Sequence, residues 1–185
     1  MVSVFSLLLP ILVAAVVVFV ASSVIHLVLP YHKSDYAQLP EEEKIRTALK
    51  PLNIPPGDYV IPYASSMKEM QSEEFQQKSK EGPRSMLTII PNGPPTMGKE
   101  LVQWFLLCVV ISLTAGYLAG AAYGPGSRYL DVFQFSGTVA FAAYGLGQVQ
   151  ASVWANRKWS TTIKNVIDGL IYALLTGGIF GWLWP

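Results

Sequence analysis

The stretch Asp168–Pro185, DGLIYALLTGGIFGWLWP, decides the fold that this sequence predicts. It is long and apolar, and it ends in aromatic side chains that suit the headgroup level of a bilayer. Small residues recur at every fourth position, so they form one edge of a helix. In lipid, close backbone approach at small residues promotes helix packing, and this edge is therefore predicted to contact another helix. The edge consists of Gly169, Ala173, Gly177 and Gly181.

The composition of the whole chain also predicts a membrane protein, with the lipid bilayer as its first partner. Of its 185 residues, 51% are hydrophobic and 14% are charged, whereas soluble domains have about 25% charged residues. The net charge is +1 and no basic block stands out, so the sequence lacks the signature of a nucleic-acid-binding protein. The single cysteine, Cys108, excludes an intramolecular disulfide and a multi-cysteine metal site.

Four segments are predicted to span the membrane: residues 1–30, 100–123, 131–154 and 163–184. A hydrocarbon core of about 30 Å needs roughly 20 apolar residues at 1.5 Å per residue, which these segments supply. The predicted fold is therefore an all-α membrane protein whose last three spans form a bundle over residues 99–185. Small residues predict further helix-packing edges on the second and third spans, at Gly116, Gly120, Gly137 and Gly147.

The segment 31–98 differs in kind and is predicted to lie outside the membrane. It holds nine of the thirteen prolines and has no apolar run of spanning length. Charge order and a capping pattern predict short helices over 40–50 and 67–81. Two β-prone runs, 59–63 and 85–90, are predicted to pair as a small sheet. The segment has little apolar material for a core, so we expect it to lie against the membrane surface or a partner protein.

Basic residues near the span ends predict the orientation. They occur at Lys33, at Lys99 and in the loop 155–164, whereas the turn 124–130 has Arg128 alone and neither terminus has any. Cytoplasmic loops carry the excess of Lys and Arg. The segment 31–98 is therefore predicted to be cytoplasmic, with both termini on the other side.

Two ionisable residues in the spans are candidates for function, because such residues are costly in lipid. His26 is a candidate ligand of a haem or a chlorophyll-type pigment, although a histidine near the interface more often bonds a neighbour such as Ser22 or a headgroup. The other histidine, His32, is close in sequence, and axial haem ligands should come from facing helices, so no intrachain bis-histidine site is expected. Asp168 suggests an ion path, or a structural pair with Lys164 one helical turn before it.

Glutamines of the third span are a further candidate feature, because Gln134 and Gln148 can line a polar cavity or bond backbone and lipid. We find no phosphate-binding glycine loop, nucleophile elbow or metal-ligand spacing. The sequence therefore predicts no enzyme and no metal site.

Three stretches carry a resemblance to known proteins: 26–36 (HLVLPYHKSDY), 91–99 (PNGPPTMGK) and the closing 168–185. With them the chain resembles a family of hypothetical four-span proteins of the bacterial inner membrane. The resemblance implies that location and topology and supplies no activity, cofactor or binding residue.

The function predicted from these features is that of a non-catalytic accessory or scaffolding subunit in a larger membrane complex, such as a respiratory or photosynthetic one. It rests on the small-residue edges and on the coreless segment 31–98, both of which favour other membrane protein subunits as partners. Two alternatives stay open: a haem or pigment carrier that uses His26, and a small oligomeric transporter or channel that uses Asp168 and the glutamines.

Overall fold

A computed structural model describes all residues from Met1 to Pro185 and divides the chain into two compact units. The helical unit comprises Met1–Ala37 and Thr96–Pro185. The second unit, Gln38–Pro95, is called the extramembrane unit after the location that its sequence predicts. Residues 31–37, which the sequence assigned to the extramembrane segment, thus fold with the helices. This difference matters, because these residues contribute to the candidate site described below.

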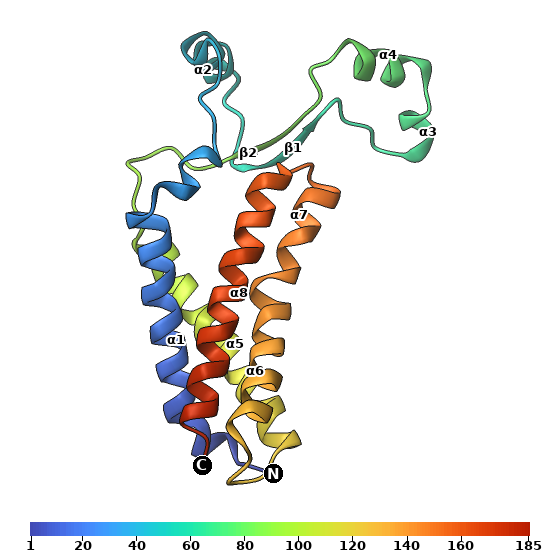
Figure 1. The fold of residues 1–185 in the computed structure, drawn as a ribbon. Coiled ribbons are helices and arrows are strands. Elements are labelled where there is room, and N and C mark those ends of the chain that lie inside the picture. The colour runs from blue at the N-terminus through green and yellow to red at the C-terminus, as the bar shows by residue number, and fades with distance from the viewer. The chain divides into compact units, whose positions relative to one another are not determined.

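The helical unit is built from long helices that run side by side (Figure 1). Three of them are long and apolar enough to cross a membrane, Val4–Val28, Gly98–Ala122 and Trp159–Trp182, which agrees with the first, second and fourth predicted spans. The first of these opens with a 3-10 turn and closes with a π-helical turn, Val24–Val28. The helices are α1 (Leu8–Ser23), α5 (Gly98–Ala122), α6 (Tyr129–Tyr144), α7 (Val149–Trp154) and α8 (Trp159–Trp182).

The third predicted span, 131–154, is not one continuous helix. Helix α6 ends at Tyr144, a 3-10 turn follows over Leu146–Gln148, and α7 begins at Val149. Gly145 lies at the break, and glycine is a poor helix former. Helix α8 also approaches closely here, because a Cβ on Gly169 would lie 2.5 Å from the Cα of Gly145. The sequence-based prediction missed the interruption because hydropathy does not report local backbone geometry.

The small-residue edge of α8 packs against α6 of the same chain. A Cβ on Gly177 would lie 2.7 Å from the carbonyl oxygen of Phe133, and one on Gly181 would lie 2.7 Å from the ring of Tyr129. On the facing helix, a Cβ on Gly137 would lie 3.4 Å from the carbonyl oxygen of Ala173. The edge that the sequence offers for docking is therefore occupied inside this chain.

The space beside the small residues of α5 is likewise occupied, by the N-terminal segment and by α8. A Cβ on Gly116 would lie 3.0 Å from the ring of Phe180, and one on Gly120 would lie 2.6 Å from the carbonyl oxygen of Val2. Gly147 differs from the prediction: it is exposed and has nothing within 4 Å of an added Cβ, so it is not a packing residue. Its place in the turn between α6 and α7 takes it off the helix face that the spacing implied.

Both chain ends lie at the end of the helical unit that carries the turn between α5 and α6 (Figure 1). The amide of Val2 donates to the carbonyl of Gly120 at 2.7 Å, and the amide of Gly126 donates to the carbonyl of Pro185 at the same distance. The indole of Trp184 also donates to the carbonyl of Gly124 at 2.9 Å. These bonds hold the N-terminus against the last turn of α5 and the C-terminus against the loop that follows α5.

The extramembrane unit contains the elements that the sequence predicts, with shifted bounds. Its first helix is confirmed as α2 (Glu42–Leu49), and its strands β1 (Gly57–Ile61) and β2 (Ser85–Ile89) pair antiparallel, with Tyr59 opposite Leu87. The helix predicted over 67–81 is two helices, α3 (Met67–Met70) and α4 (Glu73–Glu81). Ser72 causes the division, because its hydroxyl accepts a hydrogen bond from the amide of Phe75 and so begins a new helix.

Candidate functional site

The candidate site centres on His32, in the 3-10 turn Pro30–Ser34 that follows the first span. Its Nδ1 atom lies 2.6 Å from Oδ2 of Asp35, and its Nε2 atom lies 2.8 Å from Oδ2 of Asp168 in α8. A neutral imidazole has one N–H group, so only the protonated ring donates to both carboxylates at once. The ring thus joins two acidic side chains that are far apart in sequence.

Lys164 completes the charge balance of this cluster. Its ammonium group lies 2.8 Å from Oδ1 of Asp35, and it also donates to the carbonyl of Tyr31 at 2.6 Å and to the hydroxyl of Ser34 at 2.9 Å. The cluster thus combines one ammonium group, two carboxylates and an imidazole ring that lies between the carboxylates. Partly buried charges are tolerated when they are paired and hydrogen-bonded in this way.

The expected pair of Lys164 with Asp168 is wrong. Lys164 bonds Asp35, and Asp168 bonds His32 and the hydroxyl of Tyr31, which lies 3.0 Å from its Oδ1. Spacing along one helix makes a contact available, but residues 31–35 fold back onto α8 and supply closer partners for both side chains.

The electrostatics of the cluster follow from burial and from these bonds. Burial raises the pKa of the Asp35 carboxyl, but the hydrogen bonds from Lys164 and His32 outweigh burial, and the pKa lies below its ordinary value. Burial, together with the neighbouring Asp168 carboxylate, raises the pKa of the Tyr31 hydroxyl. Tyr31 therefore remains a hydrogen-bond donor, and Asp35 remains an anion, over the physiological range.

His26 lies beside this cluster, on the π-helical turn at the end of the first span. Its Nδ1 atom lies 3.0 Å from the carbonyl oxygen of Ser22, which fulfils the sequence-based expectation of a bond to that residue. The rings of His26 and His32 stack, with centroids 4.3 Å apart and planes 11° apart. Stacked rings do not direct their nitrogens at one another from opposite sides, so this pair is not an axial haem pair.

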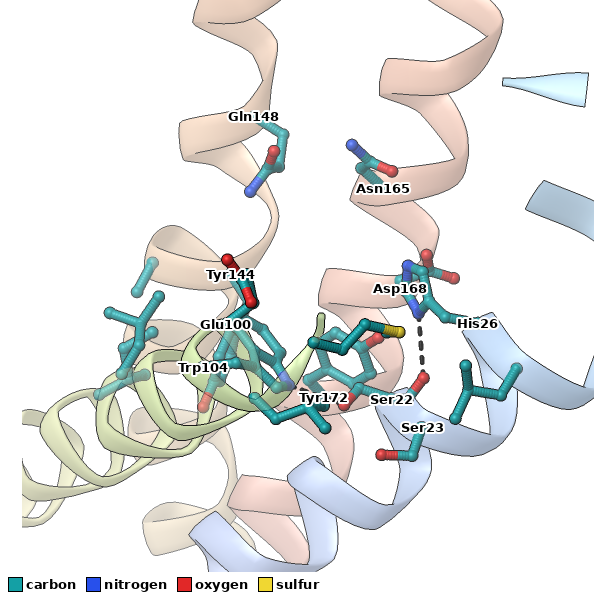
Figure 2. A pocket seen from close by; sticks show the side chains of 16 residues that line it. Ser22, Ser23, His26, Glu100, Trp104, Tyr144, Gln148, Asn165, Asp168 and Tyr172 are labelled. Atoms are coloured by element: carbon teal, nitrogen blue, oxygen red, sulfur yellow. Dashed lines mark hydrogen bonds between the residues drawn. The ribbon is translucent and has the colours of Figure 1, made fainter. Parts of the chain in front are cut away.

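A cavity of about 390 Å³ opens beside the cluster, between α1, α5, α6 and α8. Figure 2 shows His26 and Asp168 on one side of it, across from Trp104 and Tyr144. The indole of Trp104 donates to the hydroxyl of Ser22 at 2.7 Å, which fixes one wall. The lining is mostly apolar, and its polar side chains include His26, Glu100, Gln148, Asn165 and Asp168.

Aromatic side chains form the inner wall of the cavity. The rings of Trp104, Tyr144 and Tyr172 lie within 6.0 Å of one another, measured between centroids. The hydroxyls of Tyr144 and Tyr172 are buried and have no hydrogen-bond partner in the protein. Both hydroxyl oxygens are covered by protein atoms, so these tyrosines contribute their rings to the wall of the cavity.

The structure brings together three of the four polar or ligand candidates predicted from the sequence. His26, Gln148 and Asp168 all line the cavity. Gln134 is exposed on α6 and lines no part of it, and Cys108 is buried as a packing residue.

The sequence-based reasoning missed the role of residues 31–35. It weighed His32 only as a haem ligand and did not weigh Tyr31 or Asp35. The available signal was the run Tyr31–Asp35, in which two potential ligands and a phenol directly follow a span that Pro30 ends.

Comparisons of the chain with protein-family models, with curated proteins and with solved structures found no match.

Proposed function

We propose that this chain is a non-catalytic accessory subunit of a larger assembly in the bacterial inner membrane. In that assembly the extramembrane unit docks on another protein. One observation carries the proposal: none of the residues Gln38–Pro95 is buried. A segment of this length with no buried residue gains little of the apolar burial that offsets the entropy of folding.

The exposed side chains of the extramembrane unit support a protein partner. Large apolar residues are exposed here, among them Tyr63, Met67 and Ile90, each about 70% exposed. A two-stranded sheet is marginal in water without a face to pack on. Apolar surface that is exposed in this way is typical of interaction sites.

The small-residue edges support the proposal less than the sequence suggested. Those of α5 and α8 are filled by contacts within the chain, so a partner in the membrane must use other surfaces. The extramembrane unit therefore provides the main support for a partner.

The test is gentle purification of the full chain from its host membrane, followed by native electrophoresis. We expect a band larger than the detergent-bound monomer, with partner subunits in fixed ratio. The variant Met67→Ser with Ile90→Ser should lose those subunits, whereas a control with Lys68→Ser and Gln71→Ser, which changes exposed polar residues, should keep them. A monomer without stoichiometric partners, or equal partner content in both variants, would contradict the proposal.

We propose further that α6 and α7 together form a fourth crossing and that residues 31–98 are cytoplasmic. Support comes from the two termini, which are bonded to the end of α5 and to the loop after it, at one end of the helical unit. An even number of crossings puts both termini on one side of the membrane. The distribution of Lys and Arg supports a cytoplasmic location for the end of the helical unit opposite the two termini.

A second candidate function is the binding of a small molecule, in line with the carrier and transporter alternatives. The cavity favours it, because Asp168, Gln148 and His26 all face one space with apolar walls. Binding sites for small molecules are commonly such cavities with a few polar groups. For a haem or pigment carrier, the purified protein should absorb visible light; a spectrum with only aromatic absorption would eliminate that alternative.

A further inference from the structure

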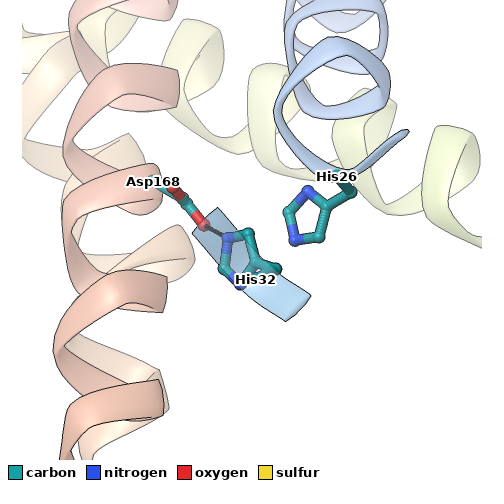
Figure 3. A group of neighbouring side chains, drawn as sticks. All are labelled: His26, His32 and Asp168. Atoms are coloured by element: carbon teal, nitrogen blue, oxygen red, sulfur yellow. Dashed lines mark hydrogen bonds and ion pairs between the residues drawn. The ribbon is translucent and has the colours of Figure 1, made fainter. Parts of the chain in front are cut away.

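We propose that His26, His32 and Asp168 form a binding site for a divalent first-row transition-metal ion at the mouth of the cavity. One nitrogen of each histidine and one carboxylate oxygen lie within 4.8 Å of one another. Figure 3 shows His32 between the other two side chains. The three residues come from three segments: the end of the first span, the turn after it, and α8.

Both imidazoles already make the second bond that ligating histidines usually make. A ligating histidine almost always donates its other N–H to a carboxylate or a backbone carbonyl, which fixes the ring and the tautomer. Here Nδ1 of His32 faces Asp35, and Nδ1 of His26 faces the carbonyl of Ser22. Both bonds leave Nε2 as the ligating atom.

Hydrogen bonds also fix the two carboxylates, Asp168 as the acidic ligand and Asp35 as the group that supports His32. Tyr31 donates to Oδ1 of Asp168, which leaves Oδ2 for an ion, and Lys164 holds the other oxygen of Asp35. Asp168 is only 3% exposed. Asp168 and His32 thus each have a side chain that holds them in place, Tyr31 and Asp35 respectively.

Metal binding requires two local changes. The Nε2 atom of His32, which lies 2.8 Å from Oδ2 of Asp168, must bind the ion without a proton, because only a neutral imidazole coordinates a metal. A metal ion also lies in the plane of each ligating ring, and the stacked rings are nearly parallel. His26 must therefore turn out of the stack, which its exposure and its single bond to Ser22 allow.

The ligand set selects the class of ion. Two imidazole nitrogens and one carboxylate suit Zn²⁺, Fe²⁺, Co²⁺ or Ni²⁺, whereas Mg²⁺ and Ca²⁺ prefer oxygen ligands throughout. Three protein ligands also leave a coordination position open. Because His26 and Asp168 line the cavity, that position is directed toward the space where a small molecule can enter.

The test is a titration of the full chain with Co²⁺ in detergent, after treatment with a chelator. The chain is purified through a peptide tag that contains no histidine, since a polyhistidine tag would bind the ion itself. We expect one Co²⁺ per chain, seen as a visible absorption band, with displacement by Zn²⁺ and none by Mg²⁺. The absence of saturable binding in the wild-type protein would overturn the proposal.

Variants distinguish this site from non-specific binding. His26→Ala should abolish saturable binding and leave the thermal midpoint close to that of the wild type, because His26 is exposed. Asp35→Asn, which removes the charge behind His32, should weaken binding by about 10- to 100-fold. Asp131→Asn, a change in an exposed ion pair with Arg128, is the control and should bind normally. Unchanged affinity in His26→Ala would refute the site even if all the variants fold.

Discussion

The ammonium group of Lys164 lies 2.8 Å from a carboxylate oxygen of Asp35, a residue 129 positions earlier in the chain. The bond joins the start of α8 to the segment that follows the first span. Because Asp35 also bonds His32, and His32 bonds Asp168, one chain of contacts fixes the geometry of the whole cluster.

Replacement of Lys164 by alanine should destabilise the helical unit. The side chains of Lys164 and Asp35 are 17% and 8% exposed, so removal of the base leaves a largely buried carboxylate with less compensation. Loss of one partner of a fully buried pair costs about 3–5 kcal/mol, and partial exposure here reduces the expected loss to about 2 kcal/mol. Thermal unfolding in detergent measures it. Lys33→Ala, an exposed neighbour, is the control and should change stability little.

Acid should weaken the same cluster. The pKa of Asp35 is lower in the folded protein than its ordinary value of 3.8. The carboxylate therefore stabilises the fold fully at pH values above 3.8, and this contribution is lost as the pH falls through the lower pKa of the folded state. The thermal midpoint of the wild type should therefore fall steeply below about pH 4. Asp35→Asn should show a shallower fall over the same range. Parallel curves for the two proteins would mean that Asp35 contributes no pH dependence.

The packing of α8 on α6 predicts a destabilising substitution at one of two adjacent glycines and a neutral one at the other. A methyl group on Gly177 would lie 2.7 Å from the backbone oxygen of Phe133, which moves only if the helices separate. Gly177→Ala should therefore cost about 1–3 kcal/mol. Gly178→Ala adds the same methyl group 3.8 Å from the Tyr129 hydroxyl and should be neutral. Unfolding midpoints of the two variants make the comparison, and equal midpoints would argue against this packing.

The wall of the cavity provides a second matched pair. Ser22 and Ser23 each donate to the carbonyl of Phe19, but only Ser22 accepts the bond from Trp104. Ser22→Ala leaves the indole N–H without its acceptor, at a cost of about 1–3 kcal/mol, and should shift the tryptophan fluorescence. Ser23→Ala should do neither. If the two variants behave alike, the Trp104 bond does not contribute.

The fourth crossing can be tested with single cysteines. Cys108 is buried, so it should not react with a membrane-impermeant maleimide and can remain in place. In sealed right-side-out vesicles, Arg128→Cys should be labelled, whereas Arg157→Cys and Gln71→Cys should be labelled only after permeabilisation. Labelling of positions 128 and 157 from the same side would show that α6 and α7 do not cross.

Much of the fold was predictable from local pattern. Length and hydropathy located three apolar helices, because the bilayer requires a run of about 20 apolar residues whatever their partners are. Capping and turn residues located α2 and the two strands, because those signals act within a few residues. The break after Tyr144 was not predictable, since it depends on how α8 lies against Gly145.

The candidate site was only partly predictable. His26 and Asp168 could be identified because they are ionisable residues within predicted spans, where such groups are energetically costly. Spacing along the helix assigned Lys164 to Asp168, and this was wrong because a partner from another segment lies closer. His32 and Asp35 follow the first span and carry no periodic signal that connects them with α8.

The sequence by itself determined the class of protein, the position of its apolar helices and the small residues along their edges. These follow from composition and from periods of a few residues, which one segment contains on its own. Only the tertiary structure decided what fills those edges and which charges meet. Contacts such as His32 with Asp168 join residues 136 positions apart. Their formation depends on the direction in which the chain leaves each helix, a property of the whole fold and not of any one segment.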